Sequence, residues 1–174
     1  MAHALIVVDM LNDFVRPDGA LYVPGAEAIV PAVRRELEAA RSAGDLVVYA
    51  CDRHAPDDRE FARFPPHAVA GTPGAEVVAE LAPGRGEVVV AKTRFSPFFR
   101  TELDRMLAER DIDRATVVGV CTHICVMETV AGLANRDIAV RLPLDAVADF
   151  DAEQAAMAVR RMQSLFGAEL VEAA

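Results

Sequence analysis

The sequence predicts an α/β protein with three layers, α/β/α, built around a mostly parallel central sheet. Short, continuous apolar runs alternate along the chain with longer segments in which apolar residues recur every three or four positions. A continuous run is typical of a strand covered on both faces, and the longer spacing is typical of an amphipathic helix. Because strands that alternate with helices form right-handed crossovers, they lie parallel, with helices on both faces of the sheet.

The first half of the chain contains three expected strands and one expected helix. The strands are the apolar runs at 5–8, 46–49 and 87–91. Between the first two, apolar residues recur at helical spacing from Ile29 to Ala40, and Gly44 closes this helix. Residues 52–86 carry most of the prolines and little periodicity, which predicts a long functional loop with one short helix near 75–81.

The second half repeats the alternation of helix and strand. Thr101 and Asp104 resemble a capping box at the start of a helix, and strands are expected at 115–120, 138–142 and, as an edge strand, 168–171. A further helix is expected from about His123 to Asn135. The last helix follows a cap-like pair, Asp151 and Gln154, and ends at Gly167.

Length and composition narrow the class of protein. A chain of 174 residues without a shift in composition predicts a single domain over 1–174. The net charge of −9 disfavours nucleic-acid binding, which needs clustered Lys and Arg. No apolar run approaches a membrane span, and the first strand meets Asp9 too early for a signal peptide. Three cysteines without a framework spacing predict reduced thiols and a cytoplasmic protein. Self-association into a homo-oligomer is left open.

Reactive side chains follow each of the first four predicted strands. Asp9 ends the first strand, Asp52 and His54 follow the second, Lys92 follows the third, and Cys125 lies just after the fourth. In a parallel sheet, ligands bind beyond the carboxyl ends of the strands. We therefore expect these side chains to meet at one edge of the sheet.

Cys125 lies where a buried strand gives way to a helix. The positive end of a helix and its free N–H groups lower the pKa of a thiol there and offer a site for an oxyanion. Asp9 can act as the base that takes the proton and returns it to a leaving amine, and Lys92 can stabilise the thiolate. The alternative is a structural ion pair between Asp9 and Lys92, with Cys125 as a core thiol.

A second set of residues has the composition of a metal site. In Asp52-x-His54 the two side chains lie on the same side of an extended segment, and Glu60 and His67 follow in the loop. Nitrogen and oxygen ligands without a thiolate suit a divalent ion, with Zn²⁺ expected and Fe or Mn as alternatives. The competing interpretation is that both histidines are exposed loop residues and that Glu60 is a solvated charge.

Five motifs occur in order over almost the whole chain. Together they resemble the isochorismatase-like cysteine hydrolases, and the nearest branch is nicotinamidase/pyrazinamidase, which implies the isochorismatase-like hydrolase fold. The motifs are VVDMLNDF at 7–14, DRH at 52–54, FPPH at 64–67 followed by GTPG at 71–74, KTRFS at 92–96, and GVCTHICV at 119–126.

The resemblance implies a role for each group of candidate residues. It implies a catalytic triad of Asp9, Lys92 and Cys125, and a metal that binds the pyridine nitrogen of the substrate. It also implies a cis peptide bond before Cys121, with the N–H groups of Cys121 and Cys125 as oxyanion donors. The implied metal ligands are Asp52, His54, Glu60 and His67, and the implied walls of the substrate pocket are Phe14 and Phe64.

The activity implied is hydrolysis of nicotinamide, and also of pyrazinamide, to the acid and ammonia through a thioester. Leu11, Phe64 and His123 depart from the residues usual in that branch, which are Gln, Trp and Asp. The sequence assigns no role to His123. Two alternatives stay open: an isochorismatase-family enzyme acting on another small amide, a carbamoyl compound or isochorismate, and an inactive metal-binding scaffold.

Overall fold

A parallel sheet forms the centre of the protein in the computed structural model, which describes residues 2–172. The strand order is β3-β2-β1-β4-β5-β7, with β6 beside the end of β4, and every strand pair in it is parallel. This confirms the predicted mostly parallel sheet. The strands are β1 (Ala2–Val8), β2 (Leu46–Asp52), β3 (Val88–Lys92), β4 (Ile112–Val120), β5 (Ala139–Pro143), β6 (Val147–Ala148) and β7 (Glu169–Val171).

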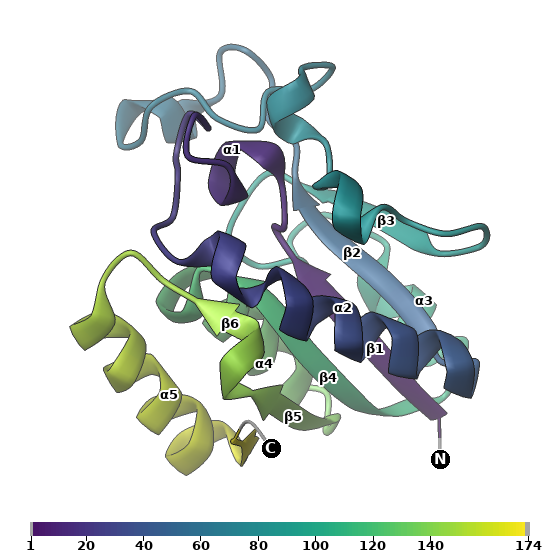
Figure 1. Ribbon diagram of the computed structural model, residues 1–174. Helices are drawn as coiled ribbons and strands as arrows, with labels where there is room; N and C mark the ends of the chain where they lie inside the picture. Colours follow the sequence, from purple (N-terminus) through teal and green to yellow (C-terminus); the bar gives the residue numbers. More distant parts are fainter. Residues whose placement is uncertain (1, 173–174) are drawn as a thin grey trace.

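Helices cover both faces of the sheet and complete the three-layer α/β/α arrangement (Figure 1). On one face, α1 (Asn12–Val15) and α2 (Ala26–Ala43) bury apolar side chains against β1, β2 and β4. On the other face, the core contains side chains of α3 (Leu103–Ala108), α4 (Met127–Ala134) and α5 (Ala152–Phe166). No helix among residues 2–172 is long and apolar enough to span a membrane.

The carboxyl ends of the central strands point towards α1 and the blue-green loops at the top of Figure 1. Asp52 and Lys92 are register partners at the ends of β2 and β3. The strand order reverses between β1 and β4, which is where ligands bind in open parallel sheets. At this switch a Cβ on Gly119 would lie 2.0 Å from the carbonyl oxygen of Val8, and Gly119 has a φ of 117°. Only glycine lets β4 approach β1 this closely.

The expected helix near 75–81 is wrong. The segment instead forms two short 3₁₀ turns, Pro73–Ala75 and Ala79–Leu81, with extended backbone between them. Val77 in this extended part forms an antiparallel bridge with Leu11, and the backbone N–H of Val78 donates to the carbonyl of Met10. The loop thus replaces helical hydrogen bonds with bonds to the segment that follows β1.

The expected capping box at Thr101 is wrong, whereas the cap at Asp151 is confirmed. The hydroxyl of Thr101 accepts a bond from the N–H of Leu103, but the carboxylate of Asp104 pairs with Arg136 instead of closing the box. By contrast, Asp151 accepts bonds from the N–H groups of residues 153 and 154 at the start of α5. The Asp104 carboxylate therefore forms a tertiary contact with Arg136 and not the local capping contact that the sequence predicted.

The helix expected from about His123 begins differently from the prediction. Residues Thr122–Val126 form a single π-helical turn, and regular α-helix continues as α4 from Met127. Cys125 lies inside that turn and is buried. The sequence signals did not separate the wider turn from the α-helix, because the apolar residues on its buried side follow the same spacing.

Candidate active site and metal centre

The strand ends bring together the three residues expected in the catalytic triad. The ammonium Nζ of Lys92 lies 2.7 Å from Oδ2 of Asp9 and 3.5 Å from Sγ of Cys125. Lys92 also donates to Oδ1 of Asp52 at 2.5 Å, and the backbone N–H of Asp52 donates to Oδ1 of Asp9 at 2.7 Å. All four side chains are buried, so their charges act through little water.

The environment changes the proton affinity of the acid and of the thiol. Burial, followed by the charge of Asp52, raises the pKa of Asp9 to about 6, although Lys92 opposes this. Burial also raises the pKa of Cys125 well above its ordinary value, with Lys92 as the main opposing influence. This direction is opposite to the lowering expected for Cys125, because burial favours the uncharged thiol. A neighbouring base would help to remove its proton.

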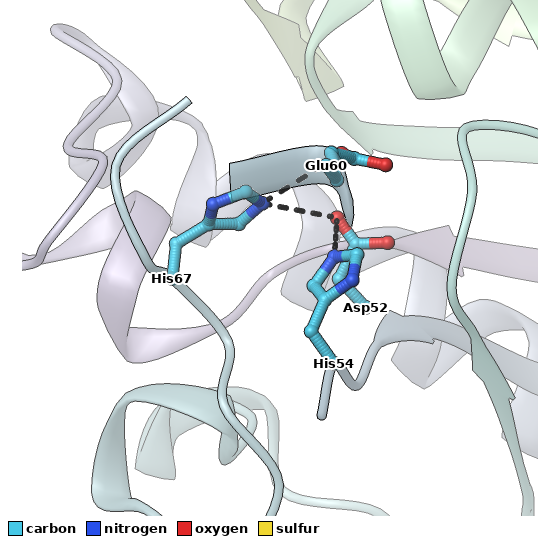
Figure 2. Close-up of side chains that lie close together, drawn as sticks. All are labelled: Asp52, His54, Glu60 and His67. Atoms are coloured by element: carbon cyan, nitrogen blue, oxygen red, sulfur yellow. Dashed lines mark ion pairs between the residues drawn. The ribbon is translucent and has the colours of Figure 1, made fainter. Parts of the chain in front are cut away.

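Asp52 also belongs to the cluster that was expected to bind a metal, together with His54, Glu60 and His67 (Figure 2). One atom from each lies within 4.8 Å of the others, and all four residues are buried. Nε2 of His54 is 3.7 Å from Oδ2 of Asp52, and Nε2 of His67 is 3.9 Å from both Asp52 and Glu60. The competing interpretation of His54 and His67 as exposed and of Glu60 as a solvated charge is wrong, because all three are buried.

Hydrogen bonds leave suitable donor atoms directed into this cluster. Nδ1 of His67 donates to the carbonyl of Pro65 at 2.7 Å, so Nε2 keeps its lone pair. Nε2 of His54 and Oε2 of Glu60 are buried without a hydrogen-bond partner among the described residues. Unpartnered buried polar atoms are rare in proteins, and two in one cluster of N and O donors fit a divalent cation.

A cavity of about 470 Å³ adjoins both clusters. Phe14 and Phe64, the residues expected in its walls, both line it, together with Asp9 and Cys125. Sequence reasoning missed most of the other lining residues, although Phe95 lies within the quoted KTRFS motif. The missed apolar residues are Leu21, Tyr22, Val23, Pro24, Phe95, Val120, Ile124 and Phe150.

Asp13 holds the metal loop against α1 and was also missed. Its Oδ2 accepts a bond from the N–H of Ala68, next to His67, at 2.8 Å, and its Oδ1 accepts from Ala20 at 3.1 Å. A Cβ on Gly74 would overlap the Asp13 carboxylate, so this position admits only glycine. The signal was available in the motifs NDF and GTPG, but their contact joins segments about 60 residues apart.

The peptide bond between Val120 and Cys121 is cis, as the resemblance implied. Cys121 and Cys125 both line the cavity. Their roles as oxyanion donors stay a prediction. Cys121 is buried like Cys125, but the contact of Lys92 is with the sulfur of Cys125.

The structure places His123, to which the sequence assigned no role. Its Nδ1 lies 2.6 Å from Oδ2 of Asp149, and the same oxygen accepts a bond from its backbone N–H at 2.8 Å. The ring also contacts the edge of Phe150, which lines the cavity. His123 therefore fastens the π-helical turn to the segment before α5.

Comparison with known proteins agrees with this geometry. Residues 3–174 match the family model for the isochorismatase domain. The structure resembles nicotinamidase/pyrazinamidase from Bacillus subtilis with a TM-score of 0.94 at 34% identity, covering 99% of this chain and 100% of that chain. It resembles pyrazinamidase of Pyrococcus horikoshii in complex with zinc with a TM-score of 0.93 at 32% identity, covering 99% and 100%.

A third solved structure has a different name. N-carbamoylsarcosine amidase from Thermoplasma acidophilum matches with a TM-score of 0.90 at 34% identity, covering 99% of this chain and 96% of that chain. The fold is therefore shared by enzymes named for different amide substrates. The family match extends over nearly the whole chain, and the chain belongs to the isochorismatase family.

Proposed function

We propose that this protein hydrolyses nicotinamide to nicotinate and ammonia, accepts pyrazinamide as well, and uses Cys125 as its nucleophile. The observation that carries the proposal is the cavity that joins the two clusters. Its lining includes Asp9 and Cys125 together with the candidate metal ligands Asp52, Glu60 and His67. A ring in this cavity can present its amide to the thiol while a ring nitrogen reaches the metal site.

The first half-reaction forms a thioester. Asp9, whose pKa of about 6 lies near neutral pH, takes the proton of the Cys125 thiol, and the thiolate attacks the carboxamide carbon. The ammonium group of Lys92, 3.5 Å from the sulfur, favours the negative charge. Asp9 then returns the proton to the amide nitrogen as the C–N bond breaks, and ammonia leaves.

The second half-reaction restores the enzyme. Asp9 takes a proton from a water molecule, whose oxygen attacks the thioester carbon, and the C–S bond breaks. The proton then passes to the sulfur, which regenerates the Cys125 thiol as the acid departs. Asp9 thus serves as base and acid in turn, which requires a pKa close to the working pH.

The metal site would hold a divalent ion between Asp52, His54, Glu60 and His67. When bound, the ion supplies a Lewis-acid contact for a ring nitrogen and so fixes the orientation of the ring. Zn²⁺ is the expected ion because the donors are nitrogen and oxygen, and the similar pyrazinamidase from P. horikoshii was solved with zinc. Fe and Mn share this donor preference.

The walls of the cavity favour an aromatic amide. Of the carboxyl groups in its lining, those of Asp9 and Asp52 are paired with Lys92. N-carbamoylsarcosine has no ring to contact the phenylalanine side chains that line the cavity. The apolar and aromatic walls suit a pyridine or pyrazine ring instead.

A panel of four amides tests the proposal through ammonia release by the zinc-loaded protein. Nicotinamide and pyrazinamide should be hydrolysed fastest. Benzamide, which has the same ring shape without a ring nitrogen, should show a much higher KM. N-carbamoylsarcosine should release little ammonia. Equal kcat/KM for benzamide and nicotinamide would remove the metal from substrate binding, and faster turnover of the carbamoyl compound would favour the alternative enzyme class.

The contacts in the catalytic cluster argue against an inactive scaffold. Asp9, Lys92 and Cys125 are all present, Lys92 contacts both of the others, and Asp9 and Cys125 line a cavity accessible to a small molecule. A scaffold would need none of these groups at such separations. Failure to hydrolyse any amide in the panel would revive that alternative.

A further inference from the structure

Asp58 contacts two of the expected metal ligands, although it is not itself part of the metal cluster. Its Oδ2 lies 3.1 Å from Nδ1 of His54, and its Oδ1 accepts a bond from the backbone N–H of Glu60 at 2.9 Å. We propose that Asp58 is a positioning residue that orients His54 and Glu60 for the metal and that Arg94 holds it in place. This inference rests on the metal site of the proposed function.

The contact with His54 determines which ring nitrogen faces the cluster. A carboxylate beside Nδ1 accepts a hydrogen bond from this nitrogen, which keeps the proton on Nδ1. Nε2 then keeps the lone pair that a metal needs. Nε2 is the atom that points towards Asp52 and has no hydrogen-bond partner. The rings of Phe61 and His67 pack against the His54 ring in edge contacts. Asp58 adds a hydrogen bond to Nδ1 of the same ring.

The contact with Glu60 acts through the backbone. Asp58 is the N-cap of the 3₁₀ turn Arg59–Ala62, and its side chain accepts a hydrogen bond from the N–H of Glu60, the second residue of that turn. The turn directs the Glu60 side chain into the cluster, where Oε1 lies 3.9 Å from Nε2 of His67. One carboxylate therefore supports a nitrogen ligand through its ring and an oxygen ligand through its backbone.

Arg94 connects Asp58 to β3, the strand that carries Lys92. Its Nη1 donates to Oδ1 and Oδ2 of Asp58 at 3.0 and 3.2 Å. Arg94 lies two residues beyond Lys92, so the contact joins the metal loop to the end of β3. The side chain of Asp58 is only 9% exposed, which strengthens this pair compared with an exposed one.

The neighbouring Asp57 provides a matched control. It has the same side chain one position earlier, is exposed, and makes no hydrogen bond or ion pair within the described part of the chain. Asp57→Ala removes a carboxylate from the same loop without touching either ligand. A difference between the two alanine variants therefore reports the contacts of Asp58 and not the charge of the loop.

The test is a zinc-competition titration of the zinc-loaded full chain with a chromophoric chelator. Asp58→Ala should raise the Kd for Zn²⁺ about 10- to 100-fold, the usual loss when the partner of a ligating histidine is removed. Asp57→Ala should stay within about twofold of the unaltered protein. Asp58→Asn keeps one side-chain oxygen as an acceptor and should fall between them, which keeps the test valid if the alanine variant folds poorly.

A second measurement separates orientation of the ligands from general stability. The visible absorption spectrum of the cobalt-substituted protein reports the arrangement of the ligands, and it should change in Asp58→Ala but not in Asp57→Ala. An unchanged spectrum together with a lower Tm of the metal-free protein would reduce Asp58 to a structural role and overturn the inference.

His54→Ala distinguishes failure of this inference from failure of the metal site. If His54→Ala loses zinc while Asp58→Ala binds it as tightly as the unaltered protein, the inference is wrong and the metal site stands. If neither variant weakens binding, the metal site is wrong, and the inference fails with it.

Discussion

The two halves of the site differ in how their charges are satisfied. At the strand ends, the ammonium of Lys92 lies between the carboxylates of Asp9 and Asp52, so each buried charge has a partner within the chain. In the loop, Nε2 of His54 and Oε2 of Glu60 are buried without a hydrogen bond among the described residues, and their charged neighbours Asp52 and Arg94 lie 3.7 and 3.9 Å away. The catalytic cluster thus has its cation in close contact, whereas the loop cluster has only distant ion pairs and leaves room for a bound cation.

The strand ends and the metal loop also differ in what holds their side chains in position. Backbone ladders fix the strand ends, and Asp52 and Lys92 are adjacent because they are register partners. The loop ligands depend instead on side-chain bonds from Asp13 and Asp58. We therefore expect changes at the strand ends to affect chemistry or folding outright, and changes in the loop to act through metal affinity.

The largest expected effect is on the rate after loss of the nucleophile. Cys125→Ala should lower ammonia release from nicotinamide by at least about a thousandfold, because no covalent intermediate can form. Circular dichroism should show an unchanged fold. Cys51→Ala, which removes a buried thiol from β2, serves as the control and should keep its rate within about threefold. Substantial activity in Cys125→Ala would disprove the thioester.

The next effect is on folding. Lys92→Met should lower the free energy of unfolding by about 3–5 kcal/mol, because Asp9 and Asp52 lose their shared cation in a buried setting. Urea denaturation of the metal-free protein measures this. Arg34→Met breaks the exposed pair with Glu38 and should change the free energy by less than about 1 kcal/mol. Similar losses in both variants would show that burial does not set the cost of removing the cation at the strand ends.

The third effect is stabilisation by the metal. Zinc at about 100 times its Kd should raise the free energy of unfolding by about 2.7 kcal/mol, because it binds the folded chain and satisfies the loop ligands. Thermal denaturation with and without a chelator measures this change. In His67→Ala the same zinc concentration should give little stabilisation. An equal gain in that variant would place the bound zinc elsewhere.

The smallest effect is expected from removing one unsatisfied charge. Burial, and then the charge of Asp52, raises the pKa of Glu60, so its charged form is disfavoured in the metal-free protein. Glu60→Gln should leave the metal-free protein as stable as before or stabilise it by up to about 1 kcal/mol. The same change should weaken zinc binding. A marked loss of stability without metal would show that the ion pair of Glu60 with Arg94, 3.9 Å apart, stabilises the fold substantially.

Most of the fold followed from the pattern of apolar residues. The buried runs predicted the central strands, and the residues after them were correctly expected at one edge of the sheet. The failures lie where a distant contact replaced a local preference. Val77 pairs with Leu11 instead of joining a helix, and Asp104 pairs with Arg136 instead of capping one. Neither partner lies near enough in sequence to affect a local pattern.

The residues of the site divide in the same way. The sequence identified Asp9, Lys92 and Cys125 through their positions after strands, and the structure brings them into contact. It did not identify Asp58 or Asp149, because a carboxylate in a loop resembles a solvated charge until its partner is known. Phe150 was missed for a similar reason, since its place in the cavity depends on how the segment before α5 packs.

The sequence by itself determined the order of the strands along the chain, the reactive residue after each, and the family to which these motifs point. The tertiary structure decided which donor atoms lack a partner and which way the pKa of Cys125 moves. Both depend on how completely neighbouring segments exclude water, and burial is a property of the packed chain that no single segment carries.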